Sequence, residues 1–216
     1  MTTVPEKPKI YHLTHLDNLS LILQLGKLLS DAARIEQGID CEVVGMPEIK
    51  RRRLEELAVS CYPETKVGEY VPFYFCPRSI MLYILHKGNH QDITFRGGQR
   101  NLIHLMADLY EVVDWATRNH RRWSFSDRNA ATRYAHFYND VSRLDKINWM
   151  AVDATAFTDP DVKEGKQAEF LIENDFPWFL VERIGVIDES IRDQALLFLP
   201  ESGHRPFVSI EREWYY

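Results

Sequence analysis

The sequence predicts a single mixed α+β domain. A length of 216 residues is enough for one generous domain and short for two. Short segments rich in aromatic and β-branched residues alternate irregularly with amphipathic segments of helical period, and glycine and proline separate them. The chain has no internal repeat, low-complexity tract or linker, so residues 1–216 are expected to share one core.

The N-terminal part is predicted to form a strand that leads directly into a helix. Residues 9–13, KIYHL, read as a short strand. Thr14 then caps a helix over residues 15–23, and Gly26 supplies the residue that ends it. Residues 38–45, bounded by two glycines, read as a loop.

The later elements follow the same kind of signal. A helix with proline at its first position covers residues 47–59. Residues 70–75, YVPFYF, predict a strand, and Pro72 would place it at an edge or a bulge. Further predicted segments are a helix over 80–86 ended by Gly88, a helix over 128–144 capped by Ser126, and strands over 101–106, 168–172, 179–187 and 207–210.

Composition and charge narrow the classes of function. No apolar run approaches the roughly 20 residues of a membrane span, and MTTVPEKPKIYHL lacks a secretory signal pattern, so a cytoplasmic protein without a membrane partner is expected. Three cysteines without paired spacing predict neither disulfides nor a zinc site. A net charge of −6 argues against non-specific coating of nucleic acid, but residues 118–133 hold five arginines and one acid.

His12 and Thr14 form the first candidate binding site. They alternate with Leu13, so both side chains point to one side of an extended segment. The junction of a strand end and a helix start offers backbone N–H groups and a positive dipole end, which suit a phosphate or ribose. The alternative is a capping threonine beside a core histidine.

Two further segments carry cations. In Lys50-Arg51-Arg52-Arg53 the side chains spread around a helix, so one or two at most can face a site and the others form a solvated face. Arg78 follows a predicted strand end and precedes Ser79, a position that suits a cation gripping a pyrophosphate. A structural arginine bonded to backbone carbonyls is an equal alternative. Tyr74 carries a hydroxyl in the same apolar strand and needs a partner if buried.

Glu169 is the carboxylate with the weakest structural explanation. It stands between an alanine and the apolar run Phe-Leu-Ile, at the mouth of a predicted buried strand. A carboxylate in that environment is costly unless it is paired or used, and its pKa can be tuned for chemistry. The sequence therefore predicts a functional glutamate at this position.

A rival pattern overlaps this segment. Asp153 follows an apolar stretch, and Glu164-Gly165-Lys166 is an E-x-K triplet, which is the arrangement with which restriction-type nucleases bind Mg²⁺ and assist the attacking water. Gly165 weakens a strand at that point. A Mg²⁺-dependent nuclease using Asp153, Glu164 and Lys166 stands as the alternative enzyme, and a non-catalytic module that binds nucleic acid or NAD⁺ is the third hypothesis.

Taken together, the segments resemble the DarT family of DNA ADP-ribosyltransferase toxins. The matching pieces are YHLTHLDNLSLIL, PEIKRRR, YVPFYFCPRSIMLY and KQAEFLIENDFPW, in the family's order between about residues 10 and 187. YVPFYF-x-PRS and K-x-AEFL in this order are specific. A histidine that the family has in the stretch matching residues 126–130 is missing here.

The resemblance implies a fold, a cofactor and a reaction. The fold is the ADP-ribosyltransferase fold, a split pair of small sheets that clasp NAD⁺ between them, with surrounding helices. The reaction is transfer of ADP-ribose from NAD⁺, without a metal, to a base in single-stranded DNA, with thymidine favoured over guanosine. A toxin of this kind implies a partner antitoxin, a macrodomain protein that removes the mark.

The resemblance also implies site residues. Glu169 matches the catalytic glutamate, and Arg53, with Arg51 as the alternative, matches the second catalytic residue. His12, Thr14 and Asn18 match NAD⁺ contacts, to which the segment of Tyr74, Arg78 and Ser79 adds candidates. For DNA, the candidates combine charge with stacking faces in the variable segment before the catalytic strand, and they are Arg118, Arg121, Arg122 and Trp123.

Overall fold

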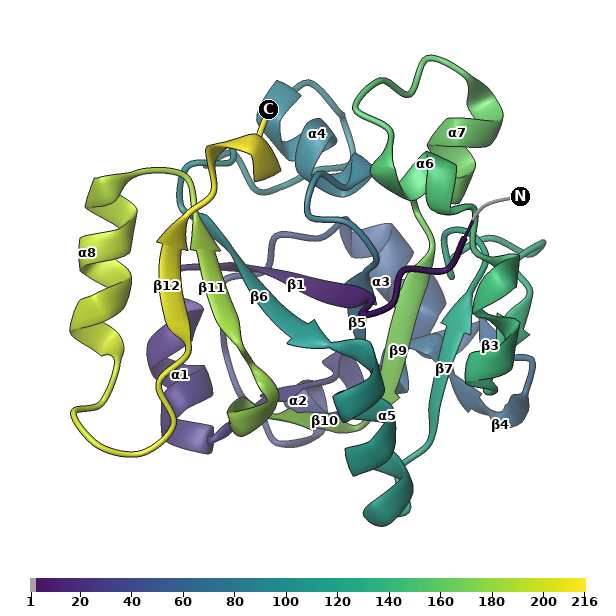
Figure 1. The fold of residues 1–216 in the computed structure, drawn as a ribbon, viewed down its shortest axis with the longest axis horizontal. Helices are drawn as coiled ribbons and strands as arrows, with labels where there is room; N and C mark the ends of the chain where they lie inside the picture. The colour runs from purple at the N-terminus through teal and green to yellow at the C-terminus, as the bar shows by residue number, and fades with distance from the viewer. Residues whose placement is uncertain (1–2) are drawn as a thin grey trace.

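An eight-stranded sheet organises the chain in the computed structural model, which describes residues 3–216 (Figure 1). All neighbouring strands are antiparallel except β11 and β12, which are parallel. In spatial order the strands are β12 (Phe207–Ile210), β11 (Arg183–Val186), β6 (Leu102–Asp108), β1 (Lys9–His15), β5 (Tyr70–Tyr74), β9 (Glu169–Glu173), β7 (Trp123–Ser126) and β8 (Phe137–Tyr138).

The sheet is divided between β1 and β5. β1 pairs with β6 along its whole length, and β5 pairs with β9 along its whole length. Between β1 and β5 the register holds a single pair, Tyr11 opposite Tyr74, so the two halves separate on either side of this point. The expected split into two sheets is therefore present, with one residue pair joining the halves.

Pro72 lies where the two halves separate. We predicted an edge or a bulge, but β5 is central in the strand order. The carbonyl of Pro72 accepts a hydrogen bond from the His12 ring, so the backbone of Pro72 faces β1. Because β1 and β5 are not paired there, the missing N–H of proline removes no ladder bond.

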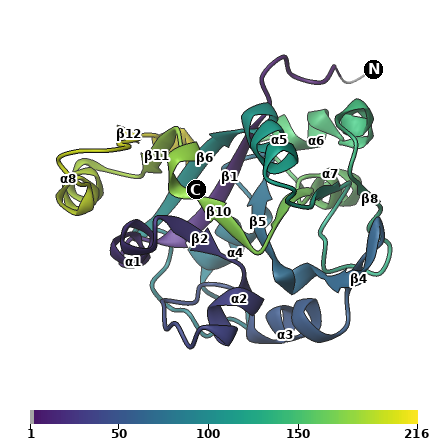
Figure 2. The same cartoon turned by 90° about the horizontal axis from the view of Figure 1, so that it is seen from below.

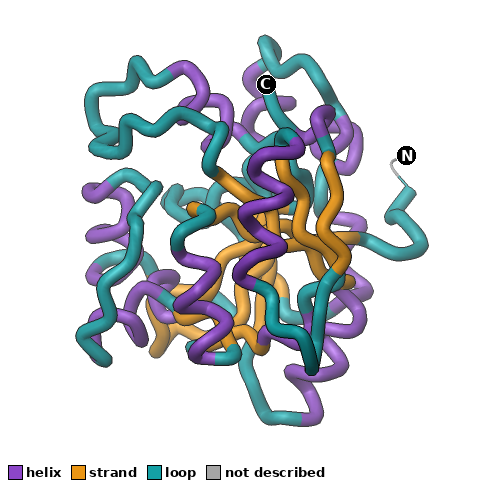
Figure 3. The backbone as a smooth tube through the Cα atoms, turned by 90° about the vertical axis from the view of Figure 1, so that its left-hand side faces the viewer, coloured by secondary structure: helices purple, strands orange, loops and turns teal. Residues whose placement is uncertain are grey.

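Helices cover both faces of the sheet. Figure 2 shows α2 (Asp31–Glu36) and α3 (Pro47–Glu55) on one face and α5 (Leu109–Arg118) and α6 (Trp149–Asp153) on the other. The strands lie inside and the helices and loops surround them (Figure 3). The remaining elements are α1 (Asn18–Leu25), α4 (Ile80–Lys87), α7 (Pro160–Gly165), α8 (Glu189–Phe198) and the small sheets β2 (Lys27–Leu29) with β10 (Asp175–Pro177) and β3 (Ala58–Val59) with β4 (Tyr62–Lys66).

Local signals placed several helix ends correctly. Gly26 follows α1 with a φ of 67°, a left-handed conformation that glycine adopts without a steric penalty. Pro47 opens α3, as predicted. The Ser79 hydroxyl caps α4 by accepting the backbone N–H of Leu82, and Gly88 ends that helix.

Other predictions of local structure were wrong. Residues 128–144 form turns, β8 and a 3-10 segment instead of a helix, because Ser126 ends a strand whose neighbours are β8 and β9. Thr14 is not a helix cap, since pairing with β6 extends β1 to His15. Residues 178–180 form a 3-10 turn ahead of the shorter strand β11.

Five helices have no counterpart among the predicted elements: α2, α5, α6, α7 and α8. Asp108 caps α5 through hydrogen bonds from the backbone N–H groups of Tyr110 and Glu111, and Asp188 caps α8. Within residues 3–216, no helix is long and apolar enough to cross a bilayer.

Candidate active site

Glu169 begins β9 and is 1% exposed, which confirms the predicted burial. Its Oε2 accepts a hydrogen bond of 2.9 Å from Arg53 Nη1, and its Oε1 accepts one of 3.0 Å from the backbone N–H of Ala130. The carboxylate is thus held by a cation and by a backbone donor, the two kinds of partner that offset the free-energy cost of burying a negative charge.

Arg53 and Arg51 lie on different faces of α3. Arg53 turns inward, with a side chain 12% exposed, and its Nη2 is buried without a hydrogen-bond partner in the described part of the chain. Burial alone would lower the pKa of Arg53, but the Glu169 carboxylate raises it. Arg51 lies in solvent and forms ion pairs with Glu48, Glu55 and Glu56. Of the two arginines that the sequence left open, only Arg53 reaches Glu169.

The loop after β7 fixes the position of Ala130. Ser126 Oγ accepts the backbone N–H of Glu169 at 3.3 Å and donates to the carbonyl of Arg128 at 2.6 Å. Asn129 accepts the N–H of Ala131 and donates to Gln167. The sequence did not single out these residues, and their signal, an S-x-x-N stretch before a predicted helix, was read as a helix cap.

Glu169 and Arg53 form one wall of a cavity of about 200 Å³. The cavity lies between the separating halves of the sheet, α1, α3 and the loop between α2 and α3. It brings together six of the predicted site residues, namely His12, Thr14, Asn18, Arg53, Tyr74 and Glu169.

His12 enters the cavity as a neutral imidazole. Burial lowers the pKa of His12 to about 4. Its Nδ1 lies 2.8 Å from the carbonyl oxygen of Pro72, which can only accept, so Nδ1 carries the proton. The lone pair is therefore on Nε2, which makes this atom a hydrogen-bond acceptor.

Thr14 and Asn18 are bonded to each other. Asn18 Nδ2 donates to Thr14 Oγ1 at 3.1 Å and to the carbonyl of Glu42 at 2.9 Å, and its Oδ1 accepts the N–H of Glu42 at 2.8 Å. The Thr14 hydroxyl keeps its own proton to donate. Both N–H donors of Asn18 are used within the protein, although the residue lines the cavity.

Tyr74 sits opposite Glu169 across the β5–β9 ladder. Burial, followed by the negative charge of Glu169, raises the pKa of the Tyr74 hydroxyl well above its usual range. The hydroxyl therefore stays protonated at neutral pH and acts as a donor or acceptor at the cavity wall.

A charged pair that the sequence did not reveal also lines the cavity. Lys50 Nζ contacts both carboxylate oxygens of Asp31, at 2.6 and 2.7 Å. Arg34 lines the same region, and its Nε is buried without a partner in the described residues. Asp31 and Arg34 lie on α2, a helix without a predicted element at this position.

Arg78 and Ser79 do not line this cavity. The Ser79 hydroxyl caps α4, and Arg78 lies over the Tyr216 ring at 4.4 Å from its centroid. The turn that follows β5 carries these residues past the site and toward the C-terminal aromatic residues. The predicted contact of Arg78 and Ser79 with the cofactor is therefore not supported by their position.

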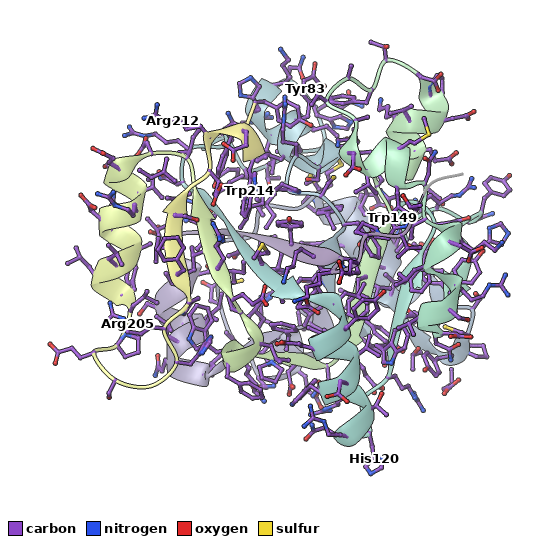
Figure 4. All side chains as sticks on the ribbon, viewed as in Figure 1. Tyr83, His120, Trp149, Arg205, Arg212 and Trp214 are labelled. Atoms are coloured by element: carbon purple, nitrogen blue, oxygen red, sulfur yellow. The ribbon has the colours of Figure 1, made fainter. Side chains whose placement is uncertain are left out.

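The arginines predicted to bind DNA lie at the end of α5 and just after it. Arg118 is the last residue of α5, which lies on the face opposite α3 (Figure 2), and Arg121 and Arg122 follow that end, which His120 marks in Figure 4. All three are paired with acids: Arg118 with Asp114, Arg121 with Asp175, and Arg122 with Glu64 and Glu173.

Trp123 is 9% exposed and stacks on Phe170 in the core, so no base can stack on its face. The stacking platform expected beside these arginines is absent from this position. The segment consists of the exposed end of α5 followed by core aromatics.

The nuclease constellation does not assemble either. Glu164 and Gly165 lie on α7, not on a strand, and Glu164 pairs with Arg128 in solvent. Lys166 is 3% exposed, and its Nζ donates to the carbonyl of Val152 at 2.9 Å. Within residues 3–216, no group of three or more His, Cys, Asp or Glu side chains is placed to hold a metal ion.

Comparison with known proteins bears on the whole chain. Residues 11–216 match the family model described as "ssDNA thymidine ADP-ribosyltransferase, DarT". A DNA ADP-ribosyl transferase of Thermus aquaticus is 39% identical over 214 residues, which cover 98% of this chain and 90% of the relative.

Solved structures agree. Thermus sp. 2.9 DarT in complex with ADP-ribosylated ssDNA matches with a TM-score of 0.86 and 34% identity, covering 100% of this chain and 99% of that one. The complex of the same protein with NAD⁺ gives a TM-score of 0.79 and covers 99% and 100%. On sequence and fold alike, this chain belongs to the DarT family of single-stranded DNA thymidine ADP-ribosyltransferases.

Proposed function

We propose that the protein transfers ADP-ribose from NAD⁺ to thymidine in single-stranded DNA, with Glu169 as the catalytic carboxylate. The observation that carries the proposal is the buried Glu169–Arg53 pair at the wall of a cavity shared with His12. The named activities of the Thermus relatives and the complexes of one of them with NAD⁺ and ADP-ribosylated DNA support it.

Glu169 stabilises the charge that develops during transfer. When the bond between the nicotinamide nitrogen and ribose C1′ breaks, its electron pair leaves with neutral nicotinamide, and positive charge grows on the ribose. A carboxylate held rigidly in a site with little water lowers the energy of that charge. The new bond joins C1′ to N3 of the base, and the N3 proton passes to Glu169, which acts as general base.

Arg53 has one nitrogen for Glu169 and one for the acceptor. Its Nη1 holds the carboxylate at 2.9 Å, and its Nη2 is buried without a partner in the described chain. An unsatisfied buried donor is costly, so its position indicates a ligand group that accepts there. We assign Nη2 to a ring carbonyl of thymine, where negative charge grows as N3 loses its proton.

His12, Thr14 and Tyr74 fit the polar groups of a dinucleotide. The neutral His12 accepts a ribose hydroxyl at Nε2, and Thr14 and Tyr74 present hydroxyls at the same cavity. These groups fix the orientation of the sugar relative to Glu169. Correct orientation is a large part of the barrier that an enzyme removes.

The loop between β7 and β8 offers a better binding surface for the DNA strand than α5 does. A surface pocket of about 410 Å³ is lined by Ala130, the residue that holds Glu169, and by Arg133 and Phe137. Arg133 is exposed, and none of the ion pairs formed within residues 3–216 includes it. Tyr134 beside it is 80% exposed. An unpaired cation next to an exposed ring is the combination that holds single-stranded nucleic acid.

Membership of this family also supports a role as the toxin of a toxin–antitoxin pair, acting on DNA in the cytoplasm. The proposed partner is a macrodomain protein that removes ADP-ribose from the modified base. Co-expression with such a protein should restore growth of cells that the active enzyme arrests. Growth arrest that persists in the Glu169→Gln variant would contradict this role.

One assay separates the proposed reaction from its alternatives. The protein is incubated with a single-stranded oligonucleotide containing one thymidine, with or without NAD⁺ and with or without EDTA. We expect a mass gain of one ADP-ribose that requires NAD⁺ and survives EDTA, and no gain on an oligonucleotide without thymidine. Strand cleavage that EDTA abolishes would favour the nuclease instead. Binding of oligonucleotide without any product would favour the non-catalytic module.

A further inference from the structure

The loop between α2 and α3 covers one side of the active-site cavity. Residues 41–45, here called the cavity loop, all line this cavity. Flanking contacts anchor its ends: the N–H of Ile39 donates to the carbonyl of Arg34, and the N–H of Lys50 donates to the carbonyl of Met46. In the described residues 3–216, no backbone–backbone hydrogen bond reaches the cavity loop itself.

Two side chains bond to the backbone of the cavity loop. Asp40 Oδ1 only accepts the N–H of its neighbour Cys41, so Asn18 makes the hydrogen bonds that tie the loop to another element. Asn18, the first residue of α1, bonds both ways to the peptide group of Glu42: Nδ2 donates to the carbonyl at 2.9 Å, and Oδ1 accepts the N–H at 2.8 Å. Its second Nδ2 proton goes to Thr14 Oγ1 at 3.1 Å. The amide thus joins the cavity loop to the strand that forms the cavity floor.

We propose that Asn18 is a positioning residue that latches the cavity loop over the NAD⁺ site, and that it acts through the loop and not by contacting the ligand. The proposal rests on the proposed function only in naming NAD⁺ as the ligand. The geometry of the latch exists without any ligand, because all three of its hydrogen bonds are made within the protein.

The expected change in loop closure follows from the number of hydrogen bonds between Asn18 and the loop. Two neutral hydrogen bonds of ordinary net strength bias the closed loop by about tenfold to a hundredfold. An enzyme whose loop is mostly open binds its ligand more weakly by the same fraction, since only closed molecules are competent. The chemistry in the closed complex is unchanged, so KM for NAD⁺ rises while kcat is largely kept.

Cys41 makes the loop position measurable without any ligand. It is half-buried in the cavity loop, and burial raises the pKa of its thiol, which slows alkylation. Opening of the loop exposes the thiol and speeds the reaction. Cys61 lies outside the cavity loop, is also half-buried and serves as the internal reference.

The experiment compares the full-length protein with Asn18→Ala and with Gln24→Ala, an exposed position on the same helix. Iodoacetamide labelling of each cysteine is followed by peptide mass spectrometry, and KM for NAD⁺ and kcat are measured with a thymidine oligonucleotide. For Asn18→Ala we expect labelling of Cys41, but not of Cys61, to speed up several-fold or more. KM for NAD⁺ should rise about tenfold or more while kcat changes little. Gln24→Ala should match the wild type.

Asn18→Asp tests the direction of the bonds. The carboxylate still accepts the N–H of Glu42 but cannot donate to its carbonyl. We expect both the labelling rate and KM to lie between those of the wild type and Asn18→Ala.

Two results overturn the latch. A rise in KM for Asn18→Ala with unchanged Cys41 labelling would make Asn18 a direct ligand contact. Equal acceleration at Cys41 and Cys61 would mean general loosening of the fold. Failure of the proposed function would give a different result. The wild-type protein would form no NAD⁺-dependent product, while Asn18→Ala would still speed the labelling of Cys41.

Discussion

The Glu169–Arg53 pair illustrates what burial does to charged residues. The two side chains are 2% and 12% exposed, so each has lost most of its hydration. Such a pair contributes little net stability, but removal of one partner leaves an uncompensated buried charge that costs about 3–5 kcal/mol. A buried ion pair that adds little stability indicates a functional role, which is the argument that singled out Glu169 from sequence.

Replacement of Glu169 tests the catalytic assignment. Glu169→Gln keeps the shape and removes the charge, so kcat should fall by about 10² to 10⁴, the range of a general base. The dissociation constant for NAD⁺, measured by calorimetry, should stay within a few-fold of the wild type. Retention of full activity in this variant would remove Glu169 from the mechanism.

The two arginines of α3 form a matched pair of variants. Arg53→Ala should lower kcat by about 10² to 10³, as loss of one donor to developing negative charge does. Arg51→Ala should leave kcat near the wild-type value, because its three glutamate partners are all in solvent. Steady-state kinetics on the thymidine oligonucleotide checks both. Equal losses would mean that orientation on α3 does not decide which arginine acts.

At the scale of elements, the loop between β7 and β8 connects Glu169 to the surface pocket that we propose for DNA. One side of the loop holds Glu169 through Ala130, and the other side lines the surface pocket with Arg133. Both follow from the sheet order, in which β7 lies next to β9. A helix over residues 128–144 would have separated these two functions.

DNA binding by the loop between β7 and β8 and DNA binding by α5 predict opposite effects of substitution. Arg133→Ala combined with Tyr134→Ala should raise KM for the oligonucleotide about tenfold or more, since stacking on one ring is worth about 1–3 kcal/mol per base. KM for NAD⁺ should be unchanged. Arg118→Ala is the control, because Arg118 is exposed but lies on α5 and is paired with Asp114. A larger rise in KM for Arg118→Ala would indicate that the DNA strand binds at α5 and not at the loop.

At the scale of the whole molecule, the sheet buries histidines that must stay neutral. His104 on β6 is 1% exposed, and burial lowers its pKa to about 4 from the ordinary 6.5. Between these two values the unfolded chain binds the proton and the folded chain does not. The contribution of neutral His104 to the free energy of unfolding is therefore complete above pH 6.5 and is lost as the pH falls toward 4.

Urea unfolding at a series of pH values measures this loss. The shift of His104 corresponds to roughly 3 kcal/mol of unfolding free energy between pH 6.5 and pH 4. His104→Gln should show a decline smaller by about that amount, whatever its stability at pH 7. An identical decline in both proteins would mean that His104 does not carry the pH dependence.

Much of the active site follows from local sequence. A glutamate inside an apolar run, a proline-led helix with consecutive cations and an alternating His-x-Thr segment each reflect forces that act over a few residues. The strands β1, β5 and β9, the C-terminal end of α1, the start of α3 and both ends of α4 were predictable for the same reason, whereas α3 ends at Glu55 and not at the predicted residue 59. The positions of Arg78 and Arg118 do not support the contacts predicted for them, because proximity along the chain does not determine which face of a sheet a residue occupies.

Composition, periodicity and residue type alone thus determined that this chain folds as one α+β domain and that its carboxylate at position 169 is buried. Tertiary structure alone decided that Arg53 and not Arg51 meets that carboxylate, that Asn18 bonds to Glu42, and that α5 with Arg118 lies on the face opposite α3. The physical reason is that these choices depend on contacts between segments 24 to 116 positions apart. Strand order and helix rotation set such contacts, and neither is encoded in any short stretch of sequence.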